Sequence, residues 1–245
     1  PSHKSGFLSQ AYSFLFYAKG VYFFARKKNY DLVFASSSRF MTAFIGAFIS
    51  KKIKTDLFLD IRDIFLDTLN DLFQGIKARV LCLIFNYVEK YTINRANSVN
   101  LVSRGFEGYF SKKYPNKKLF FFSNGIDKIF LNKKFKYPVK NEKVMVYAGN
   151  IGFGQGLHKI IPRLAVRICD TWKIVIIGDG SAKKILIKEL KINNIKNVKI
   201  IDPLEQKLLM DYYNSANVLF LHLNDYNAFK KVLPSKIFEY GATSK

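Results

Sequence analysis

Four residues near the end of the chain combine groups that bind phosphate and sugar. Pro234, Ser235 and Lys236 stand just before Glu239 in the run LPSKIFEYGA. A helix is predicted to begin here, and a helix N-terminus leaves backbone N–H groups unpaired beside a partial positive charge. Ser235 and Lys236 add a hydroxyl and an ammonium, and the Glu239 carboxylate can accept hydrogen bonds from a pair of sugar hydroxyls. The combination predicts a nucleotide-sugar site; the alternative is that Glu239 only caps the helix.

A glycine-rich turn stands between an apolar segment and a helical pattern. It contains Gly149, Asn150, Gly152, Gly154 and Gly156. Glycine allows a backbone to approach a phosphate closely because it has no Cβ. The spacing is not GxGxxG, so a dinucleotide is disfavoured and we expect no cofactor. The alternative interpretation is a flexible loop between a strand and a helix.

A second turn, Gly178-Asp179-Gly180, ends another apolar segment. Gly-Asp-Gly is ordinary turn chemistry, so by itself this motif predicts only a turn.

Asp60, Arg62 and Asp63 follow a predicted strand in the first half of the chain. One interpretation is a structural ion pair, which an Arg between two carboxylates usually forms. The other makes Arg62 and Asp63 catalytic, with Asp63 near the reacting sugar and Arg62 near anionic groups.

The sequence contains no Asp-x-Asp pair, so we expect no metal at the nucleotide diphosphate. The charge of a leaving diphosphate would then be neutralised by Lys236, by Lys230 or Lys231, and by amides at the end of a helix.

Short apolar segments alternate with longer helical patterns along the chain. This alternation predicts an α/β fold of right-handed βαβ units, with parallel strands buried on both faces. We expect strands at Leu32–Ala35, Asp56–Ile61, Ser98–Val102, Lys118–Phe122, Val144–Tyr147, Lys173–Ile177, Val198–Ile201 and Val218–Leu223. We expect helices near residues 6–28, 38–51, 72–96, 103–113, 156–169, 181–192, 204–215 and 235–243.

A polar, Lys-rich segment at residues 132–143 is the predicted linker between two halves. We therefore expect an acceptor-side domain at residues 1–141 and a nucleotide-sugar-binding domain at residues 142–245. Two Rossmann-like halves would place the carboxyl ends of their strands on a shared cleft, where ligands bind. The chain begins at Pro1 and stops at Lys245 just after a helix has begun, so we expect both domains to be incomplete pieces of a longer protein.

The net charge of +22 predicts a phosphate-bearing partner. The lysines are scattered and accompany no nucleic-acid-binding motif, so we expect no nucleic acid; a Lys-rich solvated surface and an anionic membrane remain open. The segment Phe7–Ala25 is aromatic, is interrupted by polar residues and precedes Arg26-Lys27-Lys28. It fits a helix that lies at a membrane interface, or simply a domain helix, better than one that crosses the membrane.

Taken together, several motifs resemble the GT-B glycosyltransferases of family 4, in particular the bacterial surface-polysaccharide branch that includes L-fucosamine transferases. The motifs are DIRDIF at residues 60–65, NGID at 124–127, YAGNIG at 147–152, IGDG at 177–180 and LPSKIFEY at 233–240. The resemblance implies a retaining transferase that moves a hexosyl or N-acetylhexosaminyl group from a UDP-sugar to a lipid-linked glycan in O-antigen or capsule synthesis. It implies a cytoplasmic protein peripheral to the inner face of the bacterial membrane, with residues 178–180 beside the nucleotide base.

The chain departs from this family at two places. Lys231 stands where many members have a Glu eight positions before Glu239, and Asn150 and Gln155 stand in a loop where many carry an Arg and a Lys. Two other functions stay open: a nucleotide-sugar epimerase of the same fold, and a basic nucleic-acid- or lipid-binding protein without catalysis. An epimerase needs catalytic His and carboxylates, and the chain has three His.

Overall fold

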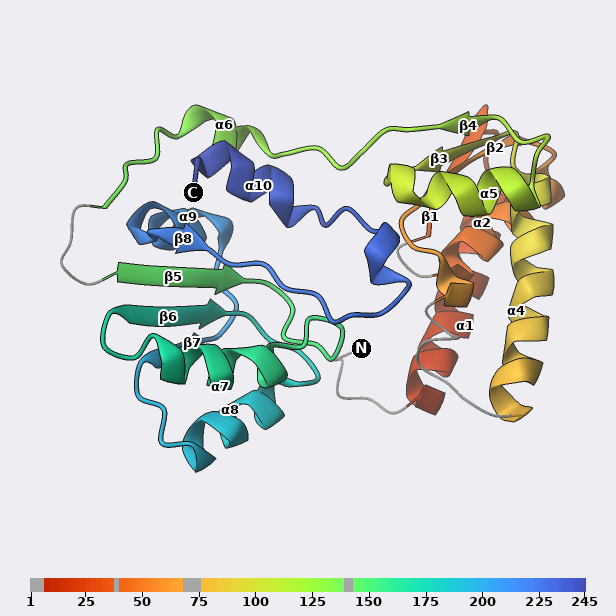
Figure 1. Ribbon diagram of the computed structural model, residues 1–245. Helices are drawn as coiled ribbons and strands as arrows, with labels where there is room; N and C mark the ends of the chain where they lie inside the picture. Colours follow the sequence, from red (N-terminus) through yellow and green to blue (C-terminus); the bar gives the residue numbers. More distant parts are fainter. Residues whose placement is uncertain (1–6, 38–39, 68–75, 139–142) are drawn as a thin grey trace. The chain divides into compact units, whose positions relative to one another are not determined.

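The computed structural model describes residues 7–37, 40–67, 76–138 and 143–245 (Figure 1). It is an α/β protein with two four-stranded sheets, and every strand pair in both sheets is parallel. This confirms the predicted fold class. The chain divides into two compact units, which are described one at a time.

The first unit comprises Pro1–Asn124 and Asp225–Leu233. Its sheet has the order β1-β2-β3-β4, and the strands are β1 (Leu32–Ser36), β2 (Asp56–Ile61), β3 (Ser98–Leu101) and β4 (Leu119–Phe120). Its described helices are α1 (Phe7–Ala25), α2 (Phe40–Ile53), α4 (Ile76–Arg95), the 3-10 helix η1 (Arg104–Phe106), α5 (Glu107–Lys113) and the 3-10 helix η2 (Phe229–Lys231).

Alternate residues of β2 form the core of this unit. Leu57 and Leu59 are fully buried and pack with Ala43 and Ala47 of α2. Phe58 belongs to the opposite face, because successive side chains of a strand alternate. There it stacks with Phe34, whose ring is exposed. The prediction that the strands are buried on both faces is therefore wrong for this part of the described sheet.

The second unit comprises Gly125–Asn224 and Pro234–Lys245. Its sheet has the order β7-β6-β5-β8, and the strands are β5 (Lys143–Ala148), β6 (Trp172–Ile177), β7 (Val198–Ile201) and β8 (Val218–Leu219). Its described helices are α6 (Lys128–Asn132), α7 (Leu157–Arg167), α8 (Lys183–Ile192), α9 (Gln206–Ser215) and α10 (Lys236–Thr243).

Three strands are shorter than predicted, β3 by one residue and β4 and β8 by more. β4 ends at Phe120 because the side chain of Asn100 replaces the next backbone partner: its Oδ1 accepts from the Phe122 N–H at 2.7 Å, and its Nδ2 donates to the Phe122 carbonyl at 3.0 Å. β8 ends at Leu219, after which one backbone bond, from the Phe220 N–H to the Val146 carbonyl, continues the ladder. The predicted helix starts at residues 6, 38 and 72 and part of the predicted linker lie outside the described residues.

The units divide the chain differently from the predicted boundary between residues 141 and 142. Phe130 of α6 is buried against Tyr213 of α9, so the segment after Asn124 packs with the second unit. The assignment of acceptor and donor to the two halves stays a prediction.

A nine-residue strap, Asp225–Leu233, belongs to the first unit although it connects β8 to α10 of the second. The Lys231 ammonium pairs with the Asp67 carboxylate at 2.6 Å, and the Ser103 hydroxyl donates to the Lys231 carbonyl at 2.6 Å. Val232 packs against the core of the first unit. Hydrophobic and polar contacts together therefore hold the strap on this unit.

Within the described residues, no helix is long and apolar enough to span a bilayer. Neither Cys82, which is half-buried, nor Cys169, which is exposed, forms a disulfide.

Replacement of Gly105 should loosen the strap. A Cβ at Gly105 would lie 2.9 Å from the Lys231 carbonyl carbon and closer still to its oxygen, so backbone must move. We expect Gly105→Ala to lower the free energy of unfolding by about 1–3 kcal/mol, the usual cost of overpacking. The matched control is Gly108→Ala on α5, where the added Cβ meets nothing within 4 Å. It should raise stability by roughly 0.5–1 kcal/mol. Urea unfolding followed by circular dichroism measures both; equal changes in the two variants would contradict the packing argument.

Candidate functional site

The glycine-rich turn leaves the carboxyl end of β5, the edge of a parallel sheet where ligands bind. Gly149 has φ +150°, a conformation that favours glycine, and its N–H donates to the Ile177 carbonyl at 2.8 Å. A Cβ on Gly149 would collide with the Lys236 Cε and lie 3.1 Å from its Nζ. The Lys236 ammonium therefore lies directly over the Gly149 backbone, although the two residues are 87 positions apart in the chain.

The Gly178-Asp179-Gly180 turn leaves the carboxyl end of β6 and packs against the first turn. Gly178 and Gly180 have φ +150° and +157°. A Cβ on Gly178 would overlap the Gly149 carbonyl oxygen, and one on Gly180 would lie 2.6 Å from the Ile151 carbonyl oxygen. Both positions thus require glycine for steric and conformational reasons. The motif is more constrained than an isolated turn.

Side-chain hydrogen bonds hold the glycine-rich turn in place. The buried Tyr147 hydroxyl donates to the Asn150 carbonyl at 2.7 Å. The Gln155 side-chain oxygen accepts from the Asn150 amide at 3.1 Å and from the Gly152 N–H at 3.2 Å. Asn150 and Gln155, the two residues that depart from the family pattern, therefore interact with each other within this turn.

The helix α10 places Pro234, Ser235, Lys236 and Glu239 in one short stretch. The Ser235 side chain is exposed and makes no capping hydrogen bond. The carboxylate of Glu239 accepts from the Tyr213 hydroxyl at 3.4 Å. The described contacts of Glu239 therefore run to α9 rather than to the N–H groups of its own helix, which argues against the capping interpretation.

Two buried tyrosines and one lysine support this site and escaped the sequence analysis. Burial raises the pKa of the Tyr240 hydroxyl to about 12, and that hydroxyl lies 3.4 Å from the Ala148 N–H at the end of β5. Burial, followed by the charge of nearby groups, also raises the pKa of Tyr213. Lys183 donates to the Gly178 carbonyl at 3.2 Å. Only its position four residues after Asp179 could have drawn attention to it.

The other predicted group, Asp60, Arg62 and Asp63, lies at the carboxyl end of β2 in the first unit. Asp60 is buried and accepts from the Asn100 amide at 2.8 Å and from the Arg62 Nε at 2.9 Å. The Arg62 Nη1 donates to the Asn124 side chain at 2.7 Å. The ion-pair interpretation therefore holds for Asp60 and Arg62.

Asp63 is left out of this ion pair. Partial desolvation of its carboxyl raises its pKa above the ordinary value, and the smaller opposing effect of the Arg62 charge lowers it. The residue is nonetheless accessible to solvent. A carboxyl that is accessible and has a raised pKa suits a position next to a reacting group.

Neither lysine of the strap is available as the free cation that the sequence suggested. Lys231 pairs with Asp67, and Lys230 pairs with Asp225 at 3.0 Å. Of the three lysines that the sequence suggested, this leaves Lys236, which lies over Gly149 and has no ion pair among the described residues. Lys183 also contacts the second turn, but it is paired with Asp202. Among the described residues, no group of three His, Cys, Asp or Glu side chains could hold a metal ion.

No protein-family model matches the chain, and no curated protein matches it. Solved structures do. HepE of Anabaena, in complex with UDP and glucose, aligns with a TM-score of 0.68 at 16% identity over 93% of this chain. The pneumococcal O-GlcNAc transferase GtfA, in complex with UDP and GlcNAc, aligns with a TM-score of 0.60 at 10% identity over 91% of this chain. The lipopolysaccharide outer core galactosyltransferase WaaB aligns with a TM-score of 0.53 at 18% identity over 85% of this chain.

These similarities show the fold: the chain has the GT-B glycosyltransferase architecture of two parallel α/β sheets. The chain spans 60% of the length of HepE, 55% of WaaB and 43% of GtfA.

The two aspartates after β2 should respond oppositely to removal of their charge. Because the native pKa of Asp63 is raised, ionisation costs stability above that pKa and not below the unfolded pKa of about 4. Asp63→Asn should therefore unfold at the same or a higher temperature at pH 7, and any gain should disappear as the pH falls through the native pKa. Asp60→Asn, which weakens hydrogen bonds to a buried carboxylate, should lose about 1.5–3 kcal/mol. Thermal unfolding between pH 3 and 8 tests both. A clear loss of stability in Asp63→Asn at pH 7 would refute the desolvation argument.

Proposed function

We propose that the protein is a retaining glycosyltransferase of the family-4 type that transfers a hexosyl or N-acetylhexosaminyl group from a UDP-sugar. The acceptor is a lipid-linked glycan, and the reaction serves the synthesis of a surface polysaccharide such as O-antigen or capsule. The observation that carries this proposal is the juxtaposition of the Lys236 ammonium with two glycine turns at the carboxyl ends of β5 and β6. The structures of HepE and GtfA contain UDP and a sugar, which supports the donor class.

In this proposal the second unit binds the donor. The exposed Asn150 and the neighbouring Gly149 and Gly152 border the diphosphate together with Ser235, and Lys236 neutralises its charge. Gly178, Asp179 and Gly180 border the base, and Glu239 accepts hydrogen bonds from the ribose hydroxyls. As the donor bond breaks, negative charge grows on the departing diphosphate. A fixed ammonium therefore stabilises the transition state more than the ground state.

The transfer replaces one bond at the anomeric carbon by another. The bond to the diphosphate oxygen breaks and its electron pair leaves with UDP, while the acceptor hydroxyl oxygen bonds to the same face of that carbon. The hydroxyl proton passes to the departing phosphate oxygen, which lies on the same face. The sugar ring gains positive charge on the way, and a carboxylate such as Asp63 stabilises it. Arg62, held by Asp60 and Asn124, presents its remaining N–H groups to anionic parts of the substrates.

The histidines of the second unit support a transferase over an epimerase. His222 Nδ1 lies 2.7 Å from the Gln155 carbonyl, and Nδ1 of His158 is buried. Burial and the Lys159 charge lower the pKa of His158, and the smaller effect of the Glu189 charge opposes them. Among the described residues of the second unit, neither imidazole hydrogen-bonds to the Glu239 carboxylate. The proposed site of action is the cytoplasmic face of the membrane, where a lipid-linked acceptor and the basic surface of the protein would meet.

Two substitutions on α10 should separate donor binding from turnover. Glu239→Gln should weaken UDP-sugar binding by roughly 1.5–3 kcal/mol, the range for a hydrogen bond to a charged group. Lys236→Ala should lower kcat more than it weakens binding, because leaving-group charge grows toward the transition state. Isothermal titration and steady-state kinetics of the full-length protein measure these effects. Glu205→Gln and Lys207→Ala, exposed residues beside and on α9, are controls that should change neither. Unchanged donor affinity in Glu239→Gln with a loss of fold stability would assign Glu239 a structural role instead.

Transfer should persist in excess EDTA, because the proposed site neutralises the diphosphate with Lys236 and backbone N–H groups. Release of UDP, measured with and without the chelator, tests this. Complete loss of activity that Mg²⁺ or Mn²⁺ restores would show that a divalent ion takes part.

A further inference from the structure

An apolar stripe runs along the first half of α4. Val80, Leu83, Ile84 and Tyr87 follow the i, i+3, i+4, i+7 spacing of one helix face, and each is between 52% and 74% exposed. The face of a helix that points to water is ordinarily polar. A contiguous row of exposed apolar side chains instead marks a surface that contacts another apolar phase.

The helix α1 carries a similar stripe. Tyr12, Leu15 and Phe16 are each at least 67% exposed, at i, i+3 and i+4. Both helices pack against α2, so the two stripes belong to the same helical layer of the first unit (Figure 1).

Cations lie close to aromatic rings at the end of α1 and on α2. The Arg26 guanidinium lies 5.7 Å from the centre of the Phe23 ring, and the Lys28 ammonium lies 5.1 Å from that of Phe24. On α2, the Lys52 ammonium lies 5.6 Å from the Phe48 ring centre. Aromatic rings with adjacent cationic groups fit the boundary between lipid headgroups and acyl chains.

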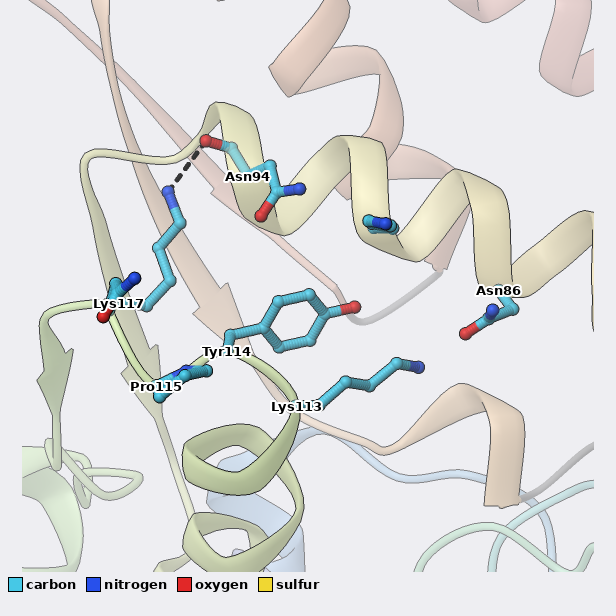
Figure 2. Close-up of a pocket in the computed structure, with 8 residues that line it drawn as sticks. Asn86, Asn94, Lys113, Tyr114, Pro115 and Lys117 are labelled. Carbon is cyan, nitrogen blue, oxygen red and sulfur yellow. Dashed lines mark hydrogen bonds between the residues drawn. The ribbon is translucent and has the colours of Figure 1, made fainter.

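A basic hollow of about 370 Å³ lies beside the second half of α4 (Figure 2). Lys90 and Asn86 of this helix line it, together with Lys113 and Lys117. Lys90 and Asn86 continue the edge of the α4 stripe, because they lie seven and three residues after Leu83. The stripe and the hollow are therefore neighbouring parts of one helix surface.

The charges in the hollow are only partly neutralised. Lys113 pairs with the buried Glu89 carboxylate at 2.7 Å. Lys117 donates to the Asn94 and Ala96 carbonyls, each at 2.7 Å, which leaves its positive charge without a carboxylate. Among the described residues, Lys90 has no ion pair and the Asn86 amide has no hydrogen bond. The hollow thus combines excess positive charge with unused donors, a complement to a phosphate.

The hollow lies away from the proposed reacting groups of the same unit. It is formed at the end of α5 and in the loop that enters β4, at the amino-terminal edge of the sheet. Asp60, Arg62 and Asp63 lie at the carboxyl-terminal edge. It is therefore not a part of the substrate site proposed above.

We propose that α4 is a bilayer-docking element, whose stripe from Val80 to Tyr87 enters an anionic membrane while the hollow around Lys90 receives a lipid phosphate. The occupant we infer is an anionic lipid bilayer, because the surface pairs apolar side chains with positive charge in the geometry of a membrane interface. This inference rests on the peripheral membrane placement in the proposed function. It adds a second element to α1 and identifies the residues that make contact.

Vesicle co-sedimentation of the full-length protein tests the inference, with vesicles of phosphatidylcholine alone or with 30% phosphatidylglycerol. The double variant Leu83→Ser, Ile84→Ser should lower the partition coefficient on mixed vesicles on the order of tenfold, because two aliphatic side chains no longer leave water. The matched control is Ile192→Ser, Leu208→Ser in the second unit. Its two residues are 65% and 52% exposed, compared with 70% and 54% for Leu83 and Ile84. It should bind like the parent.

Lys90→Gln should lower binding to the mixed vesicles about fivefold, the effect of one cation near an anionic surface, and leave binding to phosphatidylcholine unchanged. Lys188→Gln, an exposed lysine on α8, is its control. UDP-sugar affinity, measured on the same samples, should stay at the parental value in all four variants. This affinity measurement separates the two proposals. If the parent protein does not bind a UDP-sugar, the proposed transferase function is refuted and the docking role of α4 is not.

Three results would overturn the docking role of α4. The first is parental vesicle binding by both α4 variants, even if substitutions on α1 reduce it. The second is an equal loss in the α4 variants and their controls. The third is a Lys90→Gln variant that binds vesicles normally but binds a single-stranded oligonucleotide more weakly, which would assign the hollow to nucleic acid.

Discussion

The candidate donor site depends on the close approach of two backbone turns. A Cβ on Gly178 would overlap the Gly149 carbonyl oxygen, a Cβ on Gly149 would collide with the Lys236 side chain, and both glycines adopt φ +150°. This contact places the carboxyl ends of β5 and β6 together and leaves room above Gly149 for the Lys236 side chain. The Tyr147 hydroxyl donates to the Asn150 carbonyl within the first turn, and the Ile151 N–H donates to the Asp179 carbonyl of the second turn. An alanine at either glycine would disturb the cation as well as the backbone.

The first unit uses a different strategy to position its polar groups. Asp60 is buried, and serine, arginine and asparagine side chains satisfy its carboxylate. A buried charge with good partners is costly to disturb, since removal of a partner leaves it uncompensated. The network thus keeps Arg62 in one orientation. Asp63, which takes no part in it, retains the freedom and the raised pKa of a carboxyl that can respond to a substrate.

Much of this organisation could be predicted from local sequence. The apolar strands and the glycine turns at their ends follow from residue type and periodicity, and these placed Gly149 and Gly178 correctly at strand ends. The roles of Tyr213 and Asn100 could not be predicted in this way. Each acts through one side-chain contact with a distant residue, and neither spacing nor composition encodes such a contact. The lengths of β4 and β8 were overestimated for a similar reason, because apolar character continues beyond the last strand hydrogen bond.

The strap at residues 225–233 also had no sequence signal, and it affects how the protein is made. Ser103 bonds to the carbonyl of a residue 128 positions further along the chain. At about 5–20 residues per second, a ribosome needs roughly 6–26 s to synthesise that distance. During this interval Ser103 and Gly105 lack the Lys231 backbone that covers them in the finished protein, and Asp67 lacks the Lys231 ammonium. The first unit therefore cannot complete its packing until nearly all of the second has emerged, and chaperones have their longest access to this surface during synthesis.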